Sequence, residues 1–259
     1  MSDDEGQPTV RVVYGDFGDP LCVLASQRLN ALNSVGAGLE WRPVEQHPDA
    51  PVMGCQFSSQ ASKDLDSAMS AVVGRLLPGE VLRWNRPGFA VHTQAAVSAF
   101  AEADGAGVGD DVRRLLFSGY WVHRANIGDP EVMRRLIPGA ILRGHSPSDP
   151  LRRFGYAVSP SRGPITTGAY ERIRHWQNER AELGVRGDLV LVEDGRISIG
   201  LDVLDRLAGL MKDLNAPVHV NLPDPGRYPP QSMHPPLGWA SQVGGTYRFS
   251  DMVSNARGR

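Results

Sequence analysis

The stretch that decides the fold is VRVVYGDFGDPLC, residues 10–22, in which an apolar run passes directly into the start of a helix. Residues 9–15 are β-branched or aromatic and nearly all apolar, which is typical of a strand buried on both faces. Asp19 is a favoured N-cap residue and Pro20 a favoured first helical residue, so a helix is predicted to begin there. Cys22 then falls in the first turn, where helix-terminal amides can stabilise a thiolate.

Strand-like and helix-like patterns alternate on both sides of a long central region. The first helix is predicted to end near Gly36, and residues 38–44 alternate as a second strand, so the short connections indicate a parallel β-α-β unit. Near the other end, a helix is predicted over 167–183. Residues 188–199 contain two β-like runs around an Asp-Gly turn, which predicts a hairpin. A final helix is predicted over 201–214.

The central region has a helical pattern from about residue 62 to 147. Apolar residues recur at the 3.6-residue spacing of a helix, and Phe89 is included in one such series with the residues that follow it. Pro138 is predicted to end a helix. The last part of the chain, residues 215–259, is rich in proline and is predicted to have little regular structure while packing on the body.

Four segments besides the first strand–helix turn carry a resemblance to a known family: residues 115–121, 126–132, 184–187 and 200–202. In their order and spacing they resemble the DsbA-like thioredoxin-fold family. The resemblance is to its cytosolic branch, which includes 2-hydroxychromene-2-carboxylate isomerases and kappa-class glutathione transferases. The resemblance implies an α/β, thioredoxin-like fold (β-α-β … α-β-β-α) interrupted by an all-helical insert. The implied division is a thioredoxin-like domain over 9–60 and 165–214, a helical insert over 61–164, and a Pro-rich extension over 215–259.

Two positions depart from the family pattern. The family carries Asp-x-x-Cys-Pro-x-Cys at this turn, whereas here the first, attacking cysteine is replaced by Asp19. The family also has a cis-proline facing the active cysteine, where this chain has Asp188-Leu189. Since a cis bond before a non-proline residue costs about 3 kcal/mol, the bond before Leu189 is predicted to be trans. Dithiol exchange needs an attacking thiolate and a resolving thiol, so ordinary dithiol oxidoreductase activity is not expected.

Two interpretations are open for each of the residues that remain at this turn. Asp19 is either a structural cap, worth about 1 kcal/mol, or a general base or polar contact with Asp16 nearby. Cys22 is either a small buried apolar residue or a thiol whose pKa is lowered by the helix terminus. An ionised Asp19 would partly cancel that lowering.

The resemblance also implies a ligand site between the thioredoxin domain and the insert. Asp19 and Cys22 are its candidate catalytic residues, and the candidate binding residues are Asp16, Phe17, Pro20, Trp121, His123, Asp188 and Leu189. In the isomerase and kappa-transferase branch a serine at the position of Asp19 contacts a glutathione sulfur. A carboxylate there would repel the thiolate of glutathione, which argues against glutathione as the ligand. The one candidate cofactor is a low-molecular-weight thiol.

Composition narrows the remaining classes of function. A formal net charge of −2 argues against nucleic acid, and the lack of Lys/Arg blocks and of long apolar runs argues against a membrane. The first residues are acidic and polar, unlike a secretory signal, and two cysteines are too few for a disulfide framework, so a cytoplasmic protein is expected. The seven histidines show no ligand spacing, so no metal site is expected.

Three functions are compatible with these residues. The first is a divergent, DsbA-family, oxidoreductase-like protein that binds or acts on a small molecule in the cleft, as an isomerase- or transferase-like enzyme. The second is a non-catalytic binding or assembly protein, which predicts a filled helix mouth covered by the tail or by a partner in a homo-oligomer. The third is a one-cysteine thiol enzyme, which predicts an exposed, acidic Cys22.

Overall fold

The computed structural model describes residues 11–51, 54–145, 151, 153 and 155–219. Along the chain its elements are β1 (Arg11–Gly15), α1 (Pro20–Ser34), β2 (Leu39–Pro43), β3 (Cys55–Gln56), α2 (Ser59–Val73), β4 (Phe89–Ala90), α3 (Gln94–Gly105), α4 (Gly109–Phe117), the π-helical turn η1 (Ser118–Val122), α5 (Pro130–Leu136), α6 (Pro138–Ile141), α8 (Thr167–Glu182), β5 (Val190–Glu193), β6 (Arg196–Ile199) and α9 (Leu201–Asp213). None of the helices in these ranges is long and apolar enough to cross a membrane.

The main sheet has four strands in the order β2-β1-β5-β6. β1 and β2 are parallel, with Val13 opposite Trp41, and this confirms the predicted β-α-β unit. β5 is antiparallel to β1 and to β6, which confirms the predicted hairpin. The turn between β5 and β6 places Asp194 and Gly195 at φ values of 50° and 74°, the left-handed conformation that a tight hairpin turn needs. The fold is therefore the α/β arrangement expected from the sequence.

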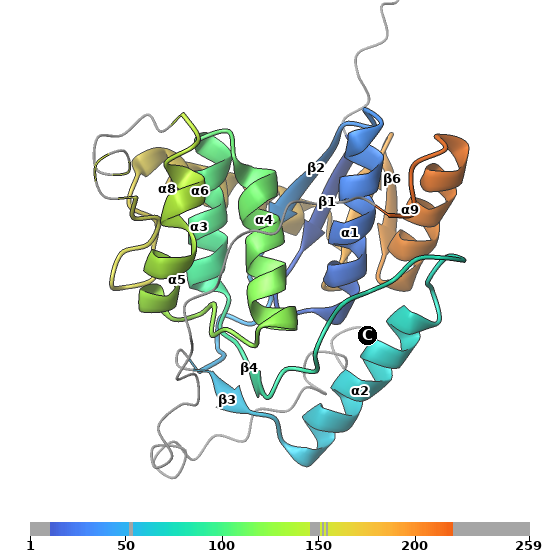
Figure 1. Ribbon diagram of the computed structural model, residues 1–259, viewed down its shortest axis with the longest axis horizontal. Helices are drawn as coiled ribbons and strands as arrows, with labels where there is room; N and C mark the ends of the chain where they lie inside the picture. Colours follow the sequence, from blue (N-terminus) through green and yellow to red (C-terminus); the bar gives the residue numbers. More distant parts are fainter. Residues whose placement is uncertain (1–10, 52–53, 146–150, 152, 154, 220–259) are drawn as a thin grey trace, which may run out of the picture.

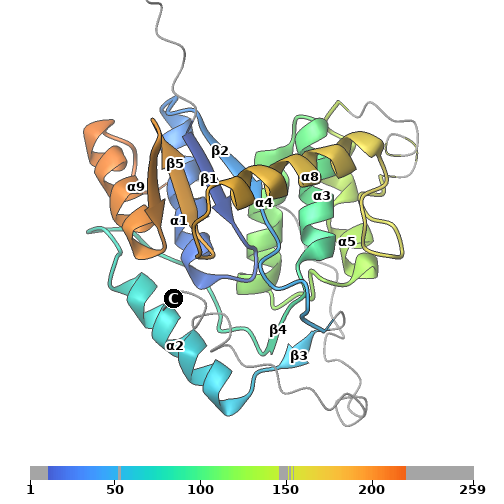
Figure 2. The ribbon, with the colours of Figure 1, turned by 180° about the vertical axis from the view of Figure 1, so that it is seen from behind.

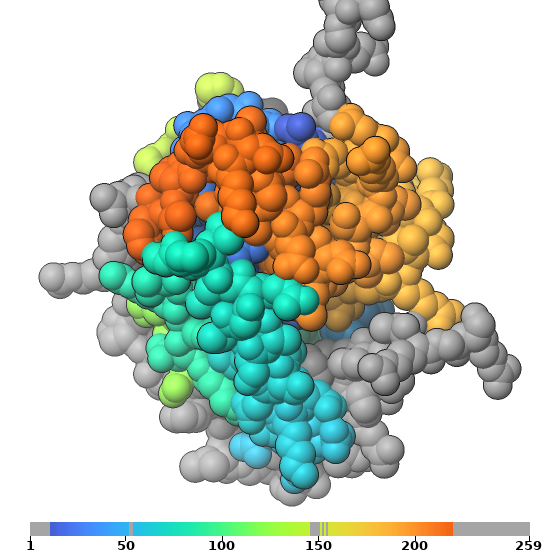
Figure 3. Space-filling model, turned by 90° about the vertical axis from the view of Figure 1, so that its right-hand side faces the viewer, coloured from blue at the N-terminus to red at the C-terminus, as the bar shows by residue number. Residues whose placement is uncertain are grey.

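Helices cover the sheet on both sides. α1 and α9 pack against each other on one face (Figure 1), and α8 lies beside α3 behind it (Figure 2). In Figure 3, α9 and the chain around α2 lie side by side and leave little of α1 visible. Arg28 of α1 is fully buried there, and its guanidinium pairs with the buried carboxylate of Glu80 at 2.7 Å.

The region predicted as an all-helical insert, residues 61–164, contains the short strand β4 as well as helices. β4 pairs antiparallel with β3, so that Phe89 lies opposite Gln56, and α3 begins only at Gln94. The prediction of a helix running through Phe89 was therefore wrong. Pro87 and Gly88 directly before β4 disfavour a helix, while a two-residue strand is stabilised by a distant partner that local periodicity does not reveal.

The helix α5 ends at Leu136, just before Pro138, as predicted. Pro138 then starts the short helix α6, since proline is favoured at the first position of a helix. The predicted Pro-rich extension lies almost entirely outside the described residues, as does the polar lead-in before residue 9. The division of the chain at residues 60, 165 and 214 stays a prediction.

Candidate functional site

The N-terminus of α1 is capped by Asp19. The Oδ1 atom of Asp19 accepts a hydrogen bond from the backbone N–H of Leu21 at 2.8 Å, and Pro20 follows as the first helical residue. The thiol of Cys22 donates a hydrogen bond to the same carboxyl group, which lowers the pKa of Asp19. Asp19 thus caps the helix, as predicted.

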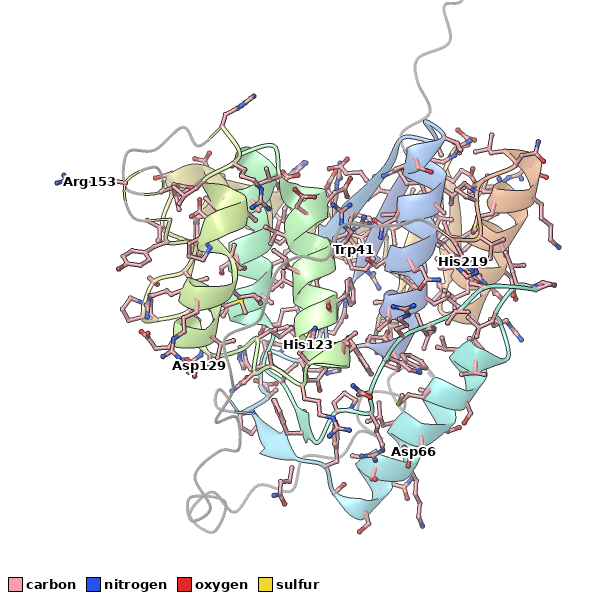
Figure 4. The ribbon with its side chains drawn as sticks, in the orientation of Figure 1. Trp41, Asp66, His123, Asp129, Arg153 and His219 are labelled. Atoms are coloured by element: carbon pink, nitrogen blue, oxygen red, sulfur yellow. The ribbon has the colours of Figure 1, made fainter. Side chains whose placement is uncertain are left out.

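Cys22 lies in the hydrophobic core beside the end of β1. Its side chain is completely buried, and burial together with the negative charge of Asp19 raises its pKa well above the usual 9.0. A Cβ atom added to Gly15 would lie 2.7 Å from the Cys22 sulfur and 2.5 Å from the indole of Trp41, so glycine is needed at the end of β1. Trp41 lies between α1 and α4 in Figure 4. The exposed, acidic thiol that a one-cysteine enzyme requires is therefore not present.

The topology of the sheet brings three polar side chains to one edge. Asp16 follows β1 and His47 follows β2, and the carboxyl ends of these parallel strands meet at the same edge. Since β5 is antiparallel to β1, its amino end also lies there, with Val190 opposite Tyr14. Asp188, two residues before β5, thereby joins Asp16 and His47. This edge beyond the carboxyl ends of strands is a common place for ligand sites in α/β folds.

Asp16 is buried and organises the loops around it. Its Oδ1 accepts a hydrogen bond from the backbone N–H of Gly18 at 2.8 Å, while its Oδ2 accepts from the N–H of Gln46 at 2.8 Å and from the hydroxyl of Thr93 at 3.0 Å. These hydrogen bonds lower the pKa of Asp16, but burial has the larger effect and raises it. Both oxygens are occupied, so Asp16 positions other residues of the site.

A cleft that opens to solvent lies at the N-terminus of α1. One side of the cleft wall is formed by the β1–α1 turn and by Asp188, and the opposite side is formed by residues 57–120. The lining residues are Asp16, Gly18, Asp19, His47, Phe57, Leu65, Ala90, Val91, Thr93, Tyr120 and Asp188. The cleft is thus acidic on the side of the sheet and mostly apolar on the opposite side.

Gly18 leaves space in the wall of the cleft. A Cβ atom added there would lie 3.4 Å from the Oδ1 of Asp16, 3.6 Å from the methyl group of Thr93 and 3.7 Å from Val91. These are ordinary van der Waals distances to three lining residues. A side chain at position 18 would therefore point into the cleft without disturbing the turn.

Asp19 and Asp188 both have raised pKa values. Burial raises the pKa of Asp19 well above 3.8, and the negative charge of Asp188 raises it further. Burial raises the pKa of Asp188 to about 6, and the positive charge of His47 partly offsets this. Two carboxyl groups of raised pKa in one cleft can exchange protons or pair with a cation.

Arg180, near the end of α8, fixes the loop that carries Asp188. Its two terminal nitrogens donate hydrogen bonds to the carbonyl oxygens of Val185 and Gly187, each at 2.7 Å. Gly187 has a φ of 136°, and a Cβ atom there would lie 2.5 Å from Ile199. The position of Asp188 is therefore set by a buried arginine and by a glycine that no other residue can replace without strain.

No family model matches the sequence, and no curated protein does so at a significant level. The structure matches a probable DsbA oxidoreductase from Streptomyces coelicolor with a TM-score of 0.56 and 17% identity, over 83% of this chain and 94% of the other. It also matches the cytosolic disulfide reductase DsbM from Pseudomonas aeruginosa, in a structure with glutathione, with a TM-score of 0.53 and 14% identity over 80% and 97%.

The chain has the DsbA-like thioredoxin fold. In this fold the two departures seen in the sequence are adjacent in space, because Asp19 and Asp188 both line the cleft. The described residues contain no cis peptide bond, so the bond before Leu189 is trans, as predicted. No group of three or more His, Cys, Asp or Glu side chains in the described ranges is arranged to hold a metal ion.

The DsbA-like fold brings only part of the predicted site to the cleft. Asp16, Asp19 and Asp188 line it. The other predicted residues do not: Phe17, Pro20, Cys22, Trp121 and Leu189 are buried in the surrounding core, and His123 is exposed beyond α4 (Figure 4). The five buried residues lie in the core because their side chains are apolar.

Trp121 supports the site without reaching it. Its indole N–H donates a hydrogen bond to the backbone carbonyl of Phe17 at 2.9 Å, and only 1% of its side chain is exposed. The indole therefore anchors η1 to the β1–α1 turn. The neighbouring Tyr120 lines the cleft, and its hydroxyl donates to the carbonyl of Phe89 at 2.6 Å.

Sequence reasoning missed the lining residues that come from loops and from short elements. His47 could have been found, because it follows a strand parallel to β1 by a few residues. Thr93 carries no local signal, since its hydroxyl does not cap α3 and instead binds Asp16. Phe57 follows a two-residue strand that the sequence did not predict.

Proposed function

We propose that this protein binds a small organic molecule in the cleft at the N-terminus of α1, and that carboxyl groups take the place of thiols there. The observation that carries the proposal is the composition of the cleft wall. Asp19 and Asp188 stand on one side, and Phe57, Leu65 and Tyr120 on the other. Binding sites for small molecules combine a mostly apolar wall with a few converging polar groups in this way.

Dithiol chemistry is not part of the proposal. Asp19 cannot attack a disulfide, and Cys22 is buried with a raised pKa. The pKa of Cys55 is also raised by burial. Because the thiolate is the reactive form of cysteine, neither residue is suited to attack a disulfide.

The two alternatives receive less support. A one-cysteine enzyme that uses a low-molecular-weight thiol would need an accessible Cys22, although one structurally similar protein is described with glutathione. A non-catalytic binding or assembly protein would need no cleft beside the capped helix, because the helix mouth would be filled and covered by the tail or by a partner. The cleft among the described residues therefore favours a small-molecule ligand.

A cytoplasmic location belongs to the same proposal. Cys22 and Cys55 are both free, and a structurally similar protein is described as a cytosolic reductase. Free thiols are the usual state of cysteine in a reducing compartment.

The test uses Gly18, whose substitution fills the cleft from its wall. Benzyl alcohol, benzylamine and benzoate serve as neutral, cationic and anionic probes in saturation-transfer NMR. We expect at least one probe to bind the unmodified protein and to lose binding in Gly18→Leu. Gly168→Leu is the matched control, because a Cβ atom at exposed Gly168 meets nothing within 4 Å. If no probe binds, or if binding survives in Gly18→Leu, the proposed function is wrong.

A further inference from the structure

Three buried glutamates among the described residues have partners within the protein that stabilise their carboxyl groups. Glu80 pairs with Arg28, and Glu193 pairs with Arg11 and Arg206. Partners are also present for Glu102, which accepts hydrogen bonds from the N–H groups of Ile165 and Thr166 and from the Thr166 hydroxyl. A buried charge generally has such partners, since the charge is otherwise costly.

Asp188 differs from these acidic side chains in its partners. Its carboxyl group is partly buried and is attracted by the charges of His47 and Arg180, but no donor in the described part of the chain forms a hydrogen bond with it. The nearby Arg180 gives its terminal N–H groups to the carbonyls of Val185 and Gly187. The carboxyl group of Asp188 instead faces the cleft.

The cleft has a deficit of positive charge. Three aspartates line it, and His47 is the only basic residue in its lining. Asp16 is satisfied by three hydrogen bonds within the protein. Asp19 accepts hydrogen bonds from the backbone N–H of Leu21 and from the thiol of Cys22, neither of which carries a positive charge. The charge still to be balanced therefore belongs to the pair of Asp19 and Asp188.

We propose that the ligand of the cleft carries a positively charged nitrogen, which lies between the carboxyl groups of Asp19 and Asp188 while its hydrocarbon part contacts Phe57, Leu65 and Tyr120. This inference rests on the proposed function. A bound metal ion is a poorer fit, because the lining provides no set of three protein ligands arranged around one point. An ammonium group needs only charge and hydrogen-bond acceptors, which two carboxylates supply.

The test compares benzylamine with benzyl alcohol, which has a similar shape and no charge, by calorimetric titration. We expect benzylamine to bind about tenfold more tightly, as a charge-assisted contact predicts. Asp188→Asn should remove this preference by lowering the affinity for benzylamine to about that for benzyl alcohol. Asp213→Asn is the matched control, since Asp213 is exposed in the last turn of α9 and its substitution changes the net charge equally.

A second variant tests whether the effect of Asp188→Asn comes from a change in structure. Asp19→Asn keeps a good N-cap residue, so α1 is preserved while one charge is lost, and we expect it to lower the affinity for benzylamine by a similar factor. Equal affinity for amine and alcohol, or an unchanged preference in both variants, would overturn the inference. If benzyl alcohol or benzoate binds in a manner sensitive to Gly18→Leu without a preference for the amine, the proposed function stands and only this inference fails.

Discussion

The hydroxyl of Thr93 donates a hydrogen bond to the Oδ2 of Asp16 across 3.0 Å, and both atoms are buried. Thr93 precedes α3, whereas Asp16 lies in the β1–α1 turn, so this contact joins the two sides of the cleft. The same oxygen also accepts from the N–H of Gln46 after β2. Asp16 is therefore the point at which three loops of the site are held together.

Asp16→Ala should destabilise the protein strongly. The substitution leaves the N–H groups of Gly18 and Gln46 and the hydroxyl of Thr93 without their acceptor, and unpaired buried donors are costly. We expect a loss of about 3 kcal/mol in the free energy of unfolding, measured with urea. Thr93→Val removes a single contact and should lose about 1 kcal/mol. Equal losses in the two variants would show that Asp16 does not organise the loops.

Asp188→Asn should stabilise the protein at neutral pH. The pKa of Asp188 is raised to about 6 in the folded state from 3.8, so ionisation opposes folding. The penalty is absent below the unfolded pKa, grows as the pH rises between the two values, and is complete above the folded one. We expect a gain of about 3 kcal/mol near neutral pH.

Urea unfolding of both proteins at several pH values measures this difference. The two stabilities should converge near pH 4, because Asp188 is then largely protonated in the folded protein and only partly ionised in the unfolded chain. A gain of the same size at every pH would point to packing and not to the charge of Asp188.

Cys22 should resist alkylation in the folded protein. Its side chain has no exposed surface, and its pKa is raised by burial and by Asp19. Labelling with iodoacetamide in a Cys55→Ser background should occur only in denaturant. Rapid labelling under native conditions, with a midpoint below the usual pKa of a thiol, would restore the one-cysteine enzyme as a hypothesis.

Asp19→Cys should recreate the paired cysteines of the fold. The N-cap position and Cys22 are separated by one turn of α1, so mild oxidation should form a disulfide, seen as the loss of two hydrogen atoms by mass spectrometry. Asp129→Cys is the matched control, because Asp129 caps α5 and is also followed by proline, while position 132 is a valine. Failure of the first variant to oxidise would mean that the turn no longer has the geometry of a dithiol site.

Most helices and strands of the thioredoxin-like fold could be predicted from the local sequence. Asp19-Pro20 predicted the beginning of α1 correctly, and the Asp-Gly turn predicted the β5–β6 hairpin. Each of these features depends on neighbouring residues, as helix capping and hairpin turns generally do. The strand β4 was missed because its pairing with β3 joins residues that are distant along the chain.

The candidate site was less predictable for the same reason. Asp16, Asp19 and Asp188 were identified by their positions in the family pattern, and all three line the cleft. Trp121 was expected there too, but its large apolar ring is more stable in the core. His47 lies at the site because β1 and β2 are parallel and because the loop after β2 carries it there. Its position can be predicted only when both features are considered together.

The central claim is that an enclosed pair of carboxyl groups, Asp19 and Asp188, occupies the place of thiol chemistry in this fold. The most direct measurement is an NMR titration of the aspartate side-chain carboxyl carbons, assigned with Asp19→Asn and Asp188→Asn. The account predicts a midpoint near 6 for Asp188 and a midpoint well above 3.8 for Asp19. Titration of both groups near 4, as for solvent-exposed aspartates, would contradict it.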